Sequence, residues 1–196
     1  MLAVDHPAVG AEDNPCNGYI TVPHLGALKL SPDWPPDGAT LAYVSYARGD
    51  PDLFVTELES GDARYLVGGH GVQGSPAFSP DGGTLVFNQT SGRNSDLYTC
   101  DREGRNMRRI THSVGINTAP AWSPDGRRLV FTSDRSGNPQ LYLAESDGTG
   151  MRRITFDGKW NDLPHWSPLG DRIAYTSRRG GLFRIAVTDA GGHGGE

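Results

Sequence analysis

Residues 120–126 read Pro-Ala-Trp-Ser-Pro-Asp-Gly, and close copies of this stretch recur along the chain at a constant spacing of 44 residues. The other copies begin at Pro32, Pro76 and Pro164. A period of about 40–45 residues is typical of β-propeller blades, each of which is a small four-stranded sheet that cannot bury its own faces. The spacing therefore predicts one all-β domain over residues 1–196, a β-propeller built from four 44-residue, four-stranded blade repeats.

The third copy shows the expected course of one blade. Residues 120–123 form the inner strand, and the Pro-Asp-Gly sequence at 124–126 turns the chain. The unbroken Leu-Val-Phe run within 128–132 suits a strand that is covered on both faces. Residues 140–144 follow as the third strand, and the more polar residues 152–155 as the outermost one. The repeat units are residues 34–77, 78–121, 122–165 and 166–190.

Each repeat carries one large aromatic residue close to the expected propeller axis. We expect this ring to wedge between neighbouring blades and to bury about 150–250 Å². In the turn that follows, the Asp accepts backbone amide protons and the Gly adopts a positive φ. These structural positions are Trp34, Phe78, Trp122 and Trp166, with Asp37, Asp81 and Asp125 and with Gly38, Gly82, Gly126 and Gly170 in the turns.

The Trp-Ser-Pro-Asp-Gly sequence, the Leu-Val-Phe-Thr-Ser-Asp-Arg strand after it and Arg-Arg-Ile-Thr at 152–155 resemble the TolB-type β-propeller repeat. The resemblance covers residues 31–190, although Pro35 replaces the Ser of the first copy and Leu169 replaces the turn Asp of the fourth. It implies a non-catalytic propeller that binds a protein partner, a lipoprotein in the TolB type, and a periplasmic or extracytoplasmic location. Similar repeats also form gating propellers beside peptidase domains and occur in polysaccharide lyases.

The number of repeats leaves two architectures open, because TolB-type propellers have six blades and this chain has room for about four. Residues 18–22 (Gly-Tyr-Ile-Thr-Val) resemble an outermost strand. As a partial blade or closing strand within 18–33, they would complete the fourth copy and close a four-bladed ring. In the alternative, the chain is an open arc of a larger six-bladed propeller, whose exposed blade faces would favour self-association.

The fourth copy departs from the others near its end. We expect its loop to be three residues shorter, so that Leu182-Phe183 match Leu141-Tyr142, and we expect it to stop near Asp189 before any fourth strand. Residues 1–17 and 191–196 are expected to be flexible ends.

Charge and composition exclude several classes of function. The net charge is −5, and the Arg pairs occur at repeat-equivalent places among Asp and Glu, so no nucleic-acid partner is expected. The sequence contains no apolar run of about 18 residues, so no membrane span is expected. The first residues lack the basic and apolar regions of a signal peptide, so none is expected in this chain.

The sequence shows no catalytic constellation, and we expect neither an enzyme nor a cofactor. The histidines form no zinc-binding spacing, so no metal site is expected. Cys16 and Cys100 could pair only if the fold brought them together. His165, at the position of Ala77 and Ala121, is either a tolerated surface residue or an imidazole that faces a ligand at the channel mouth.

Polar loops between one blade and the next are the candidate binding site. Gln73, Asn117 and Asn161 lie 44 residues apart in these loops, beside Trp160. Their amides either satisfy backbone groups of the turns or hydrogen-bond an extended segment of a protein or peptide partner. An exposed Trp160 would be a typical interface anchor. Together with His165 these residues predict a partner site at the channel mouth.

The sequence alone leaves three functions open. The repeat and the polar channel rim favour a non-catalytic protein–protein interaction module. The alternatives are the propeller portion of an enzyme, such as a peptidase gate or a polysaccharide lyase, and a structural repeat fragment without a partner. Fold alone does not select among them.

Overall fold

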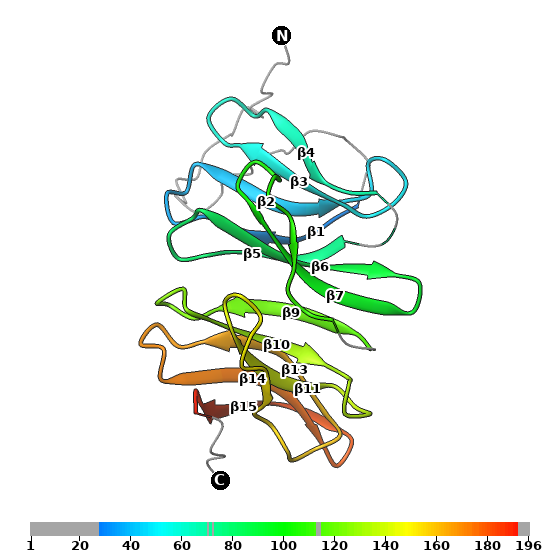
Figure 1. Cartoon of the computed structure of the whole chain (residues 1–196), viewed down its shortest axis with the longest axis vertical. Helices are drawn as coiled ribbons and strands as arrows, with labels where there is room; N and C mark the ends of the chain where they lie inside the picture. Colours follow the sequence, from blue (N-terminus) through cyan, green and yellow to red (C-terminus); the bar gives the residue numbers. More distant parts are fainter. Residues whose placement is uncertain (1–27, 70, 72, 113–114, 192–196) are drawn as a thin grey trace, which may run out of the picture.

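The computed structural model describes residues 28–69, 71, 73–112 and 115–191 of the 196-residue chain. The described residues fold into fifteen β-strands in four antiparallel sheets and contain no helix (Figure 1). The all-β class predicted from the repeat is confirmed. The first two sheets are β1 (Lys29–Asp33), β2 (Thr40–Ser45), β3 (Asp52–Glu57) and β4 (Ala63–Val67), then β5 (Gln73–Phe78), β6 (Thr84–Ser91), β7 (Asn94–Asp101) and β8 (Arg108–Arg109).

The last two sheets continue the same pattern. Within every sheet the strands follow in chain order, so each sheet is a meander with its first strand innermost. The fourth sheet has three strands among the described residues, which agrees with the expected loss of its outermost strand. These sheets are β9 (Asn117–Trp122), β10 (Arg128–Ser133), β11 (Gln140–Glu145) and β12 (Arg152–Arg153), then β13 (Trp160–Trp166), β14 (Arg172–Arg179) and β15 (Leu182–Asp189).

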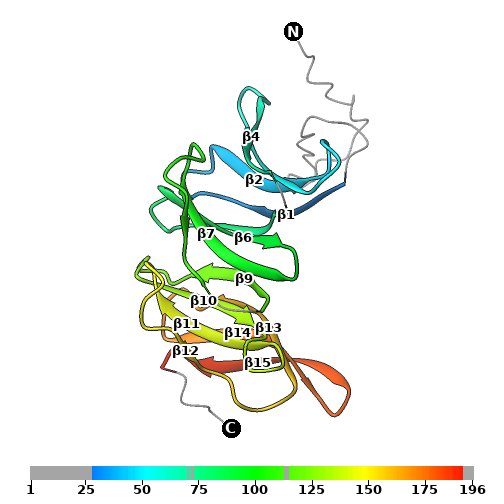
Figure 2. The ribbon, with the colours of Figure 1, turned by 45° about the vertical axis from the view of Figure 1, so that its right-hand side comes forward.

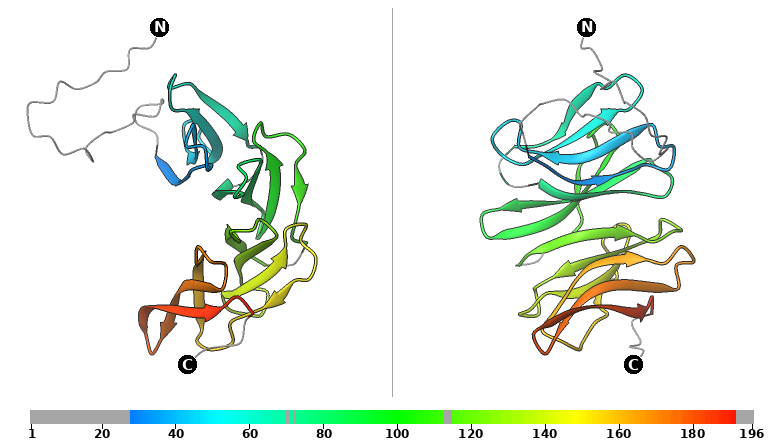
Figure 3. Two further views of the ribbon diagram at one scale, coloured as in Figure 1. Left: turned by 90° about the vertical axis from the view of Figure 1, so that its left-hand side faces the viewer. Right: turned by 180° about the vertical axis from the view of Figure 1, so that it is seen from behind.

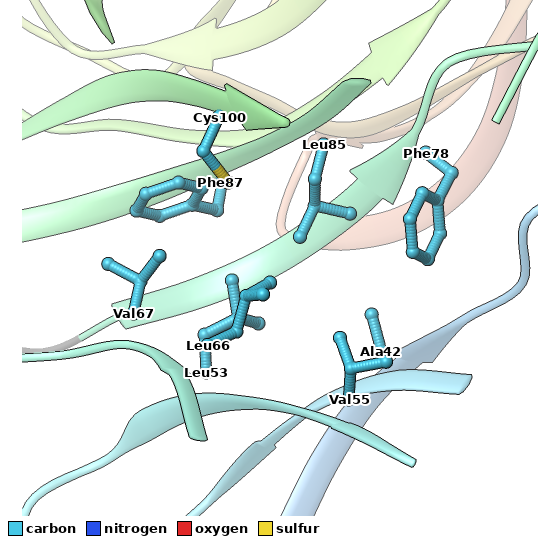
Figure 4. Close-up of a cluster of buried hydrophobic side chains, with 9 residues drawn as sticks. All are labelled: Ala42, Leu53, Val55, Leu66, Val67, Phe78, Leu85, Phe87 and Cys100. Atoms are coloured by element: carbon cyan, nitrogen blue, oxygen red, sulfur yellow. The ribbon is translucent and has the colours of Figure 1, made fainter. Parts of the chain in front are cut away.

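The core lies between neighbouring sheets. Figure 4 shows the first of three clusters, in which Leu53 and Val55 of β3 point toward Leu85 and Phe87 of β6. Val130 and Leu141 of the third sheet take part in the equivalent contact with the fourth. Because the middle strands are covered on both faces, their apolar runs are continuous rather than alternating.

The four sheets follow one another along an open arc, which is plainest in the left view of Figure 3 and also visible in Figure 2. No strand of the first sheet pairs with a strand of the fourth among the described residues. The described blades therefore form an arc rather than a closed ring of four. The closing strand predicted at residues 18–22 lies outside the described residues.

The register of the fourth sheet corrects the alignment expected from the sequence. Tyr175 pairs with Ala186 as Phe131 pairs with Tyr142, so the spacing of 44 residues continues through β15. The predicted three-residue deletion is therefore wrong. A tight hairpin causes the difference: β14 and β15 extend to the pair Arg179 and Leu182 and leave two glycines for the turn.

All four inner strands share an irregularity that the sequence did not predict. Ser31, Ser75, Ala119 and Leu163 each precede a Pro and have φ angles of 51°, 47°, 49° and 55°. At the same places the pairing of the inner strand with its neighbour shifts in register, as in a β-bulge. The bulge bends each inner strand where it passes the axis of the arc.

The Pro-Asp-Gly turns end the inner strands in one recurring geometry. Ser123 Oγ donates to Asp125 Oδ1 at 2.6 Å, and the same oxygen of Asp125 accepts from Arg127 N at 3.1 Å. In the fourth copy, where Leu169 replaces the turn Asp, Ser167 Oγ donates instead to Asp171 at 2.6 Å. The turn is kept there because a carboxylate two residues later takes over the hydrogen bond.

Candidate functional site

The inner strands of all four sheets surround a hollow on the concave side of the arc. Its volume is about 550 Å³, and it is lined by residues on both sides of each bulge. Most of the lining is Pro, Ala and Ser, so the few larger or charged side chains determine what can bind there. These are Asp33 at the end of β1, Trp34 after it, Phe78, Trp122, and Leu163 and His165 on β13. We call this space the axial hollow.

Asp33 and His165 occupy the same repeat position in the first and last blades, with Ala77 and Ala121 between them. Asp33 Oδ2 accepts a hydrogen bond from Phe78 N at 2.7 Å. Burial raises the pKa of the Asp33 carboxyl, and this effect outweighs the lowering by the backbone hydrogen bonds and by the His165 imidazole. The axial hollow thus holds a carboxyl group from its first blade and an imidazole from its last.

The four aromatic residues of the repeat do not lie in equal environments. The indole Nε1 of Trp122 donates to Ala77 O at 3.1 Å, and that of Trp166 donates to Ala121 O at 3.2 Å, so both rings bridge to the preceding blade. Phe78 is buried against the first blade. Trp34 is 52% exposed, because the described residues place no blade before it. The burial expected for Trp34 is therefore absent.

The three amides predicted as partner ligands are buried at the blade junctions. Gln73, Asn117 and Asn161 are each at most 1% exposed. With its nitrogen turned toward the nearby carbonyl groups, the Gln73 amide donates to Pro51 O at 2.6 Å. The three side chains lie inside the fold. This position agrees with the alternative in which the amides satisfy backbone groups of the turns and do not contact a partner.

Asn117 belongs to a buried polar cluster that the sequence analysis missed. Thr111 Oγ1 donates to Asp96 Oδ1 at 2.7 Å, and the Asn117 amide donates to Ser95 O at 2.8 Å. Asn117 Oδ1 in turn accepts from Arg135 at 2.9 Å. The cluster joins the third strand of one blade to the first strand of the next, so it positions the blades relative to each other.

The same cluster recurs 44 residues later. Thr155 Oγ1 donates to Gln140 Oε1 at 2.8 Å, and the Asn161 amide donates to the same oxygen at 2.8 Å. The recurring pairs Asp96/Gln140 and Thr111/Thr155 were visible in the sequence at constant spacing. The structural role of these pairs was not visible, because Asp and Gln have in common only the side-chain acceptor oxygen that this cluster needs.

Trp160 lies at a second hollow, at the opposite end of β13 from His165. This hollow has a volume of about 660 Å³ and is formed by the loop before β13, the hairpin between β14 and β15, and Asn138 of the loop between β10 and β11. Trp160 and His165 are five positions apart along β13, or about 16 Å at the rise of an extended strand. The structure therefore does not bring the predicted partner residues to one mouth.

Metal and thiol chemistry have no assembled site in the part of the chain that the structure describes. No group of three or more His, Cys, Asp or Glu side chains there is arranged to hold a metal ion. Burial raises the pKa of the Cys100 thiol to about 12, which keeps it protonated at neutral pH. Cys16 lies outside the described residues. Among the described residues no helix is long and apolar enough to cross a membrane.

Comparison with known proteins identifies the family to which this fold belongs. A family model described as the TolB β-propeller domain matches residues 17–195. The chain belongs to the TolB β-propeller domain family. The TolB-type resemblance and the β-propeller expected from the sequence are thereby confirmed.

Relatives and solved structures support the same family. The Tol-Pal system protein TolB of Xanthomonas campestris pv. campestris (strain B100) is 39% identical over 46 residues, which are 24% of this chain and 10% of that protein. The Desulfosudis oleivorans TolB is 53% identical over 32 residues, or 16% and 7% of the two chains. The crystal structure of TolB from Acinetobacter baumannii is 34% identical, has a TM-score of 0.77, and is matched over 84% of this chain and 42% of its own.

Peptidase structures share the fold at lower identity. A Mycobacterium tuberculosis puromycin-hydrolyzing peptidase is 22% identical with a TM-score of 0.65, matched over 84% of this chain and 30% of its own. This likeness shows the fold alone. The chain spans less than half the length of the TolB structure, and its matched segments cover about a tenth of the curated relatives.

Proposed function

We propose that this TolB-like propeller domain is a non-catalytic interaction module that binds an extended segment of a partner protein at the mouth of the axial hollow. The axial hollow carries the proposal, because four inner strands converge on one concavity that holds Asp33, Trp34 and His165. An apolar cavity with a few convergent polar groups is the usual form of a binding site. An exposed indole at its rim is a typical interface anchor.

The predicted partner residues take different parts in this proposal. Trp34 and His165 offer exposed side chains to a ligand in the axial hollow, and Trp160 offers another at the second hollow. Asn117 and Asn161 act indirectly, since their buried amides hold neighbouring blades in position. The relatives are named as Tol-Pal system proteins, so we propose a Pal-type protein as the partner.

Capture of a purified Pal protein tests the proposal. The immobilised chain is expected to retain the Pal protein of Xanthomonas campestris, and the double variant Trp34→Ala/His165→Ala is expected to lose at least about tenfold in affinity. Leu169→Ala is the matched control, because Leu169 is 87% exposed on a turn outside the axial hollow. Equal affinity of the double variant and the control would exclude the axial hollow as the site.

The peptidase neighbours do not support a catalytic function. The solved peptidase structures that this chain resembles are 22% identical to it or less, and a likeness at this level shows the fold and no activity. A gating or lyase role is therefore not proposed for this chain.

A further inference from the structure

Aromatic and cationic side chains gather around the second hollow, at the end of the fourth blade. Lys159 lies in the loop before β13, Trp160 is the first residue of β13, and Arg178 and Arg179 are the last two residues of β14. Phe156, in the same loop as Lys159 but outside the lining of the hollow, is largely exposed and lies under the Arg153 guanidinium at 5.1 Å. We call Phe156, Lys159, Trp160, Arg178 and Arg179 the cationic corner.

The cationic corner departs from its own repeat. At the junction of the second and third blades the equivalent positions hold small, neutral or acidic residues, apart from one shared Arg. Asp157 is the acidic residue in the cationic corner's loop, so the corner carries a local excess of positive charge on a chain whose net charge is −5. The residues 44 positions earlier are His112, Gly115, Ile116, Asp134 and Arg135.

The fold does not require a cation at position 178. At the preceding junction Asp134 Oδ1 accepts a hydrogen bond from Ile116 N at 2.7 Å and so caps the loop. A guanidinium has no acceptor and cannot repeat this bond. The fourth blade instead pairs Trp160 with Arg178 in its strand ladder. The backbone there is satisfied by strand pairing. The Arg178 guanidinium lies over the exposed Phe183 ring at 5.5 Å, a contact with the ring face that leaves its N–H donors for a further partner.

Arg179 is also released from the role of its repeat equivalent. Arg135 donates to Asn117 Oδ1 at 2.9 Å, inside the blade junction. Arg179 lies 3.6 Å from Asp157 Oδ2 instead, in an ion pair with both partners exposed, and Asn161 Oδ1 is left buried without a hydrogen-bond partner. Exposed ion pairs of this kind contribute little stability. The Arg179 guanidinium is therefore available to an incoming carboxylate.

We propose that the cationic corner binds an acidic segment of a partner protein. Arg178 and Arg179 receive its carboxylates, for which the planar guanidinium is the best matched side chain, and Lys159 adds a third positive charge. The Trp160 indole takes a neighbouring apolar or aromatic side chain of the segment. Gly180 and Gly181 carry no side chains and have open space where a Cβ would stand, so they leave the hollow accessible. The inference rests on the proposed function only in that the ligand is a protein segment.

Binding of a defined peptide tests the inference. The probe is fluorescein-labelled Asp-Glu-Phe-Glu-Asp with blocked ends, and its matched control is Asn-Gln-Phe-Gln-Asn. Fluorescence anisotropy is expected to show saturable binding of the acidic peptide and at least about tenfold weaker binding of the amide peptide. Lys159→Gly and Arg178→Asp restore the residues of the preceding junction, so both variants keep a local sequence that this fold already uses. Each variant is expected to bind the acidic peptide at least about tenfold more weakly than the unmodified chain does.

Arg93→Asp is the matched control, because it makes the same charge change on the exposed hairpin between β6 and β7. It is expected to leave binding within about twofold of the unmodified chain, as long-range charge effects are screened by salt. The inference is overturned by three results: equal affinity for the two peptides, unchanged affinity of Arg178→Asp, or tighter binding of a heparin oligosaccharide, which would assign the corner to an anionic saccharide. Failure here with intact Pal capture at the axial hollow would remove this inference and leave the proposed function standing.

Discussion

Ala119 holds a left-handed backbone conformation in the middle of an inner strand. Its φ of 49° is costly for a residue with a Cβ, by about 1–2 kcal/mol, whereas glycine adopts it freely. We expect Ala119→Gly to raise the free energy of unfolding by up to about 1 kcal/mol, measured from urea melts. Ala121→Gly, two residues further along the same strand, is expected to lower it by about 0.5–1 kcal/mol. A loss of stability in both variants would contradict the strain.

Cys100 is chemically silent in the folded chain. It is buried in the cluster between the first two blades, and burial raises the pKa of its thiol to about 12. Because the thiolate is the nucleophile, almost none is present at pH 8. In a Cys16→Ser variant we expect iodoacetamide to label the native chain far more slowly than the chain in urea, followed by mass spectrometry. Comparable rates in the two states would contradict the burial.

The junction between blades is the element on which the stability of the arc depends. Trp122 packs there and donates to the carbonyl of the preceding blade, while Trp34 has the same place in the repeat and stands half exposed. We expect Trp122→Ala to lower the free energy of unfolding by about 3–5 kcal/mol, from lost burial and the cavity left behind. Trp34→Ala is the internal control and should cost under about 1 kcal/mol. If urea melts showed equal losses of unfolding free energy for the two variants, packing at the blade junction would not explain the loss in Trp122→Ala.

The blade as an element was largely readable from the sequence. The turn residues and apolar runs predicted the strands, because each depends on neighbours within a few positions, and the 44-residue period showed that the same unit recurs. The roles of Asn117 and Trp34 were not readable, since they depend on what lies across the junction: the carbonyl of Ser95 for one and an adjacent blade for the other. The bulge at Ala119 was missed because an Ala-Pro sequence gives no signal for positive φ.

At the scale of the whole molecule, the arc leaves one blade face uncovered. Leu141 and Leu143 of β11 are buried against the fourth blade, and their equivalents on β15, Ile185 and Val187, are 76% and 52% exposed. Exposed apolar patches of this kind, beside a strand edge that pairs with no strand among the described residues, favour contact with another protein surface. The described arc is therefore expected to self-associate through the outer face of β15.

Light scattering after size-exclusion chromatography measures that association. The 196-residue chain has a mass of 21.1 kDa, and we expect a higher average mass that falls on dilution. Ile185→Asp should shift the population toward the monomer, because a charge in an apolar contact loses its hydration without a partner. Leu169→Asp introduces the same charge at a similarly exposed side chain on a turn away from β15 and should leave the mass unchanged. A chain that is monomeric at all concentrations would show that β15 is covered within its own molecule, and the open arc would then not describe the chain in solution.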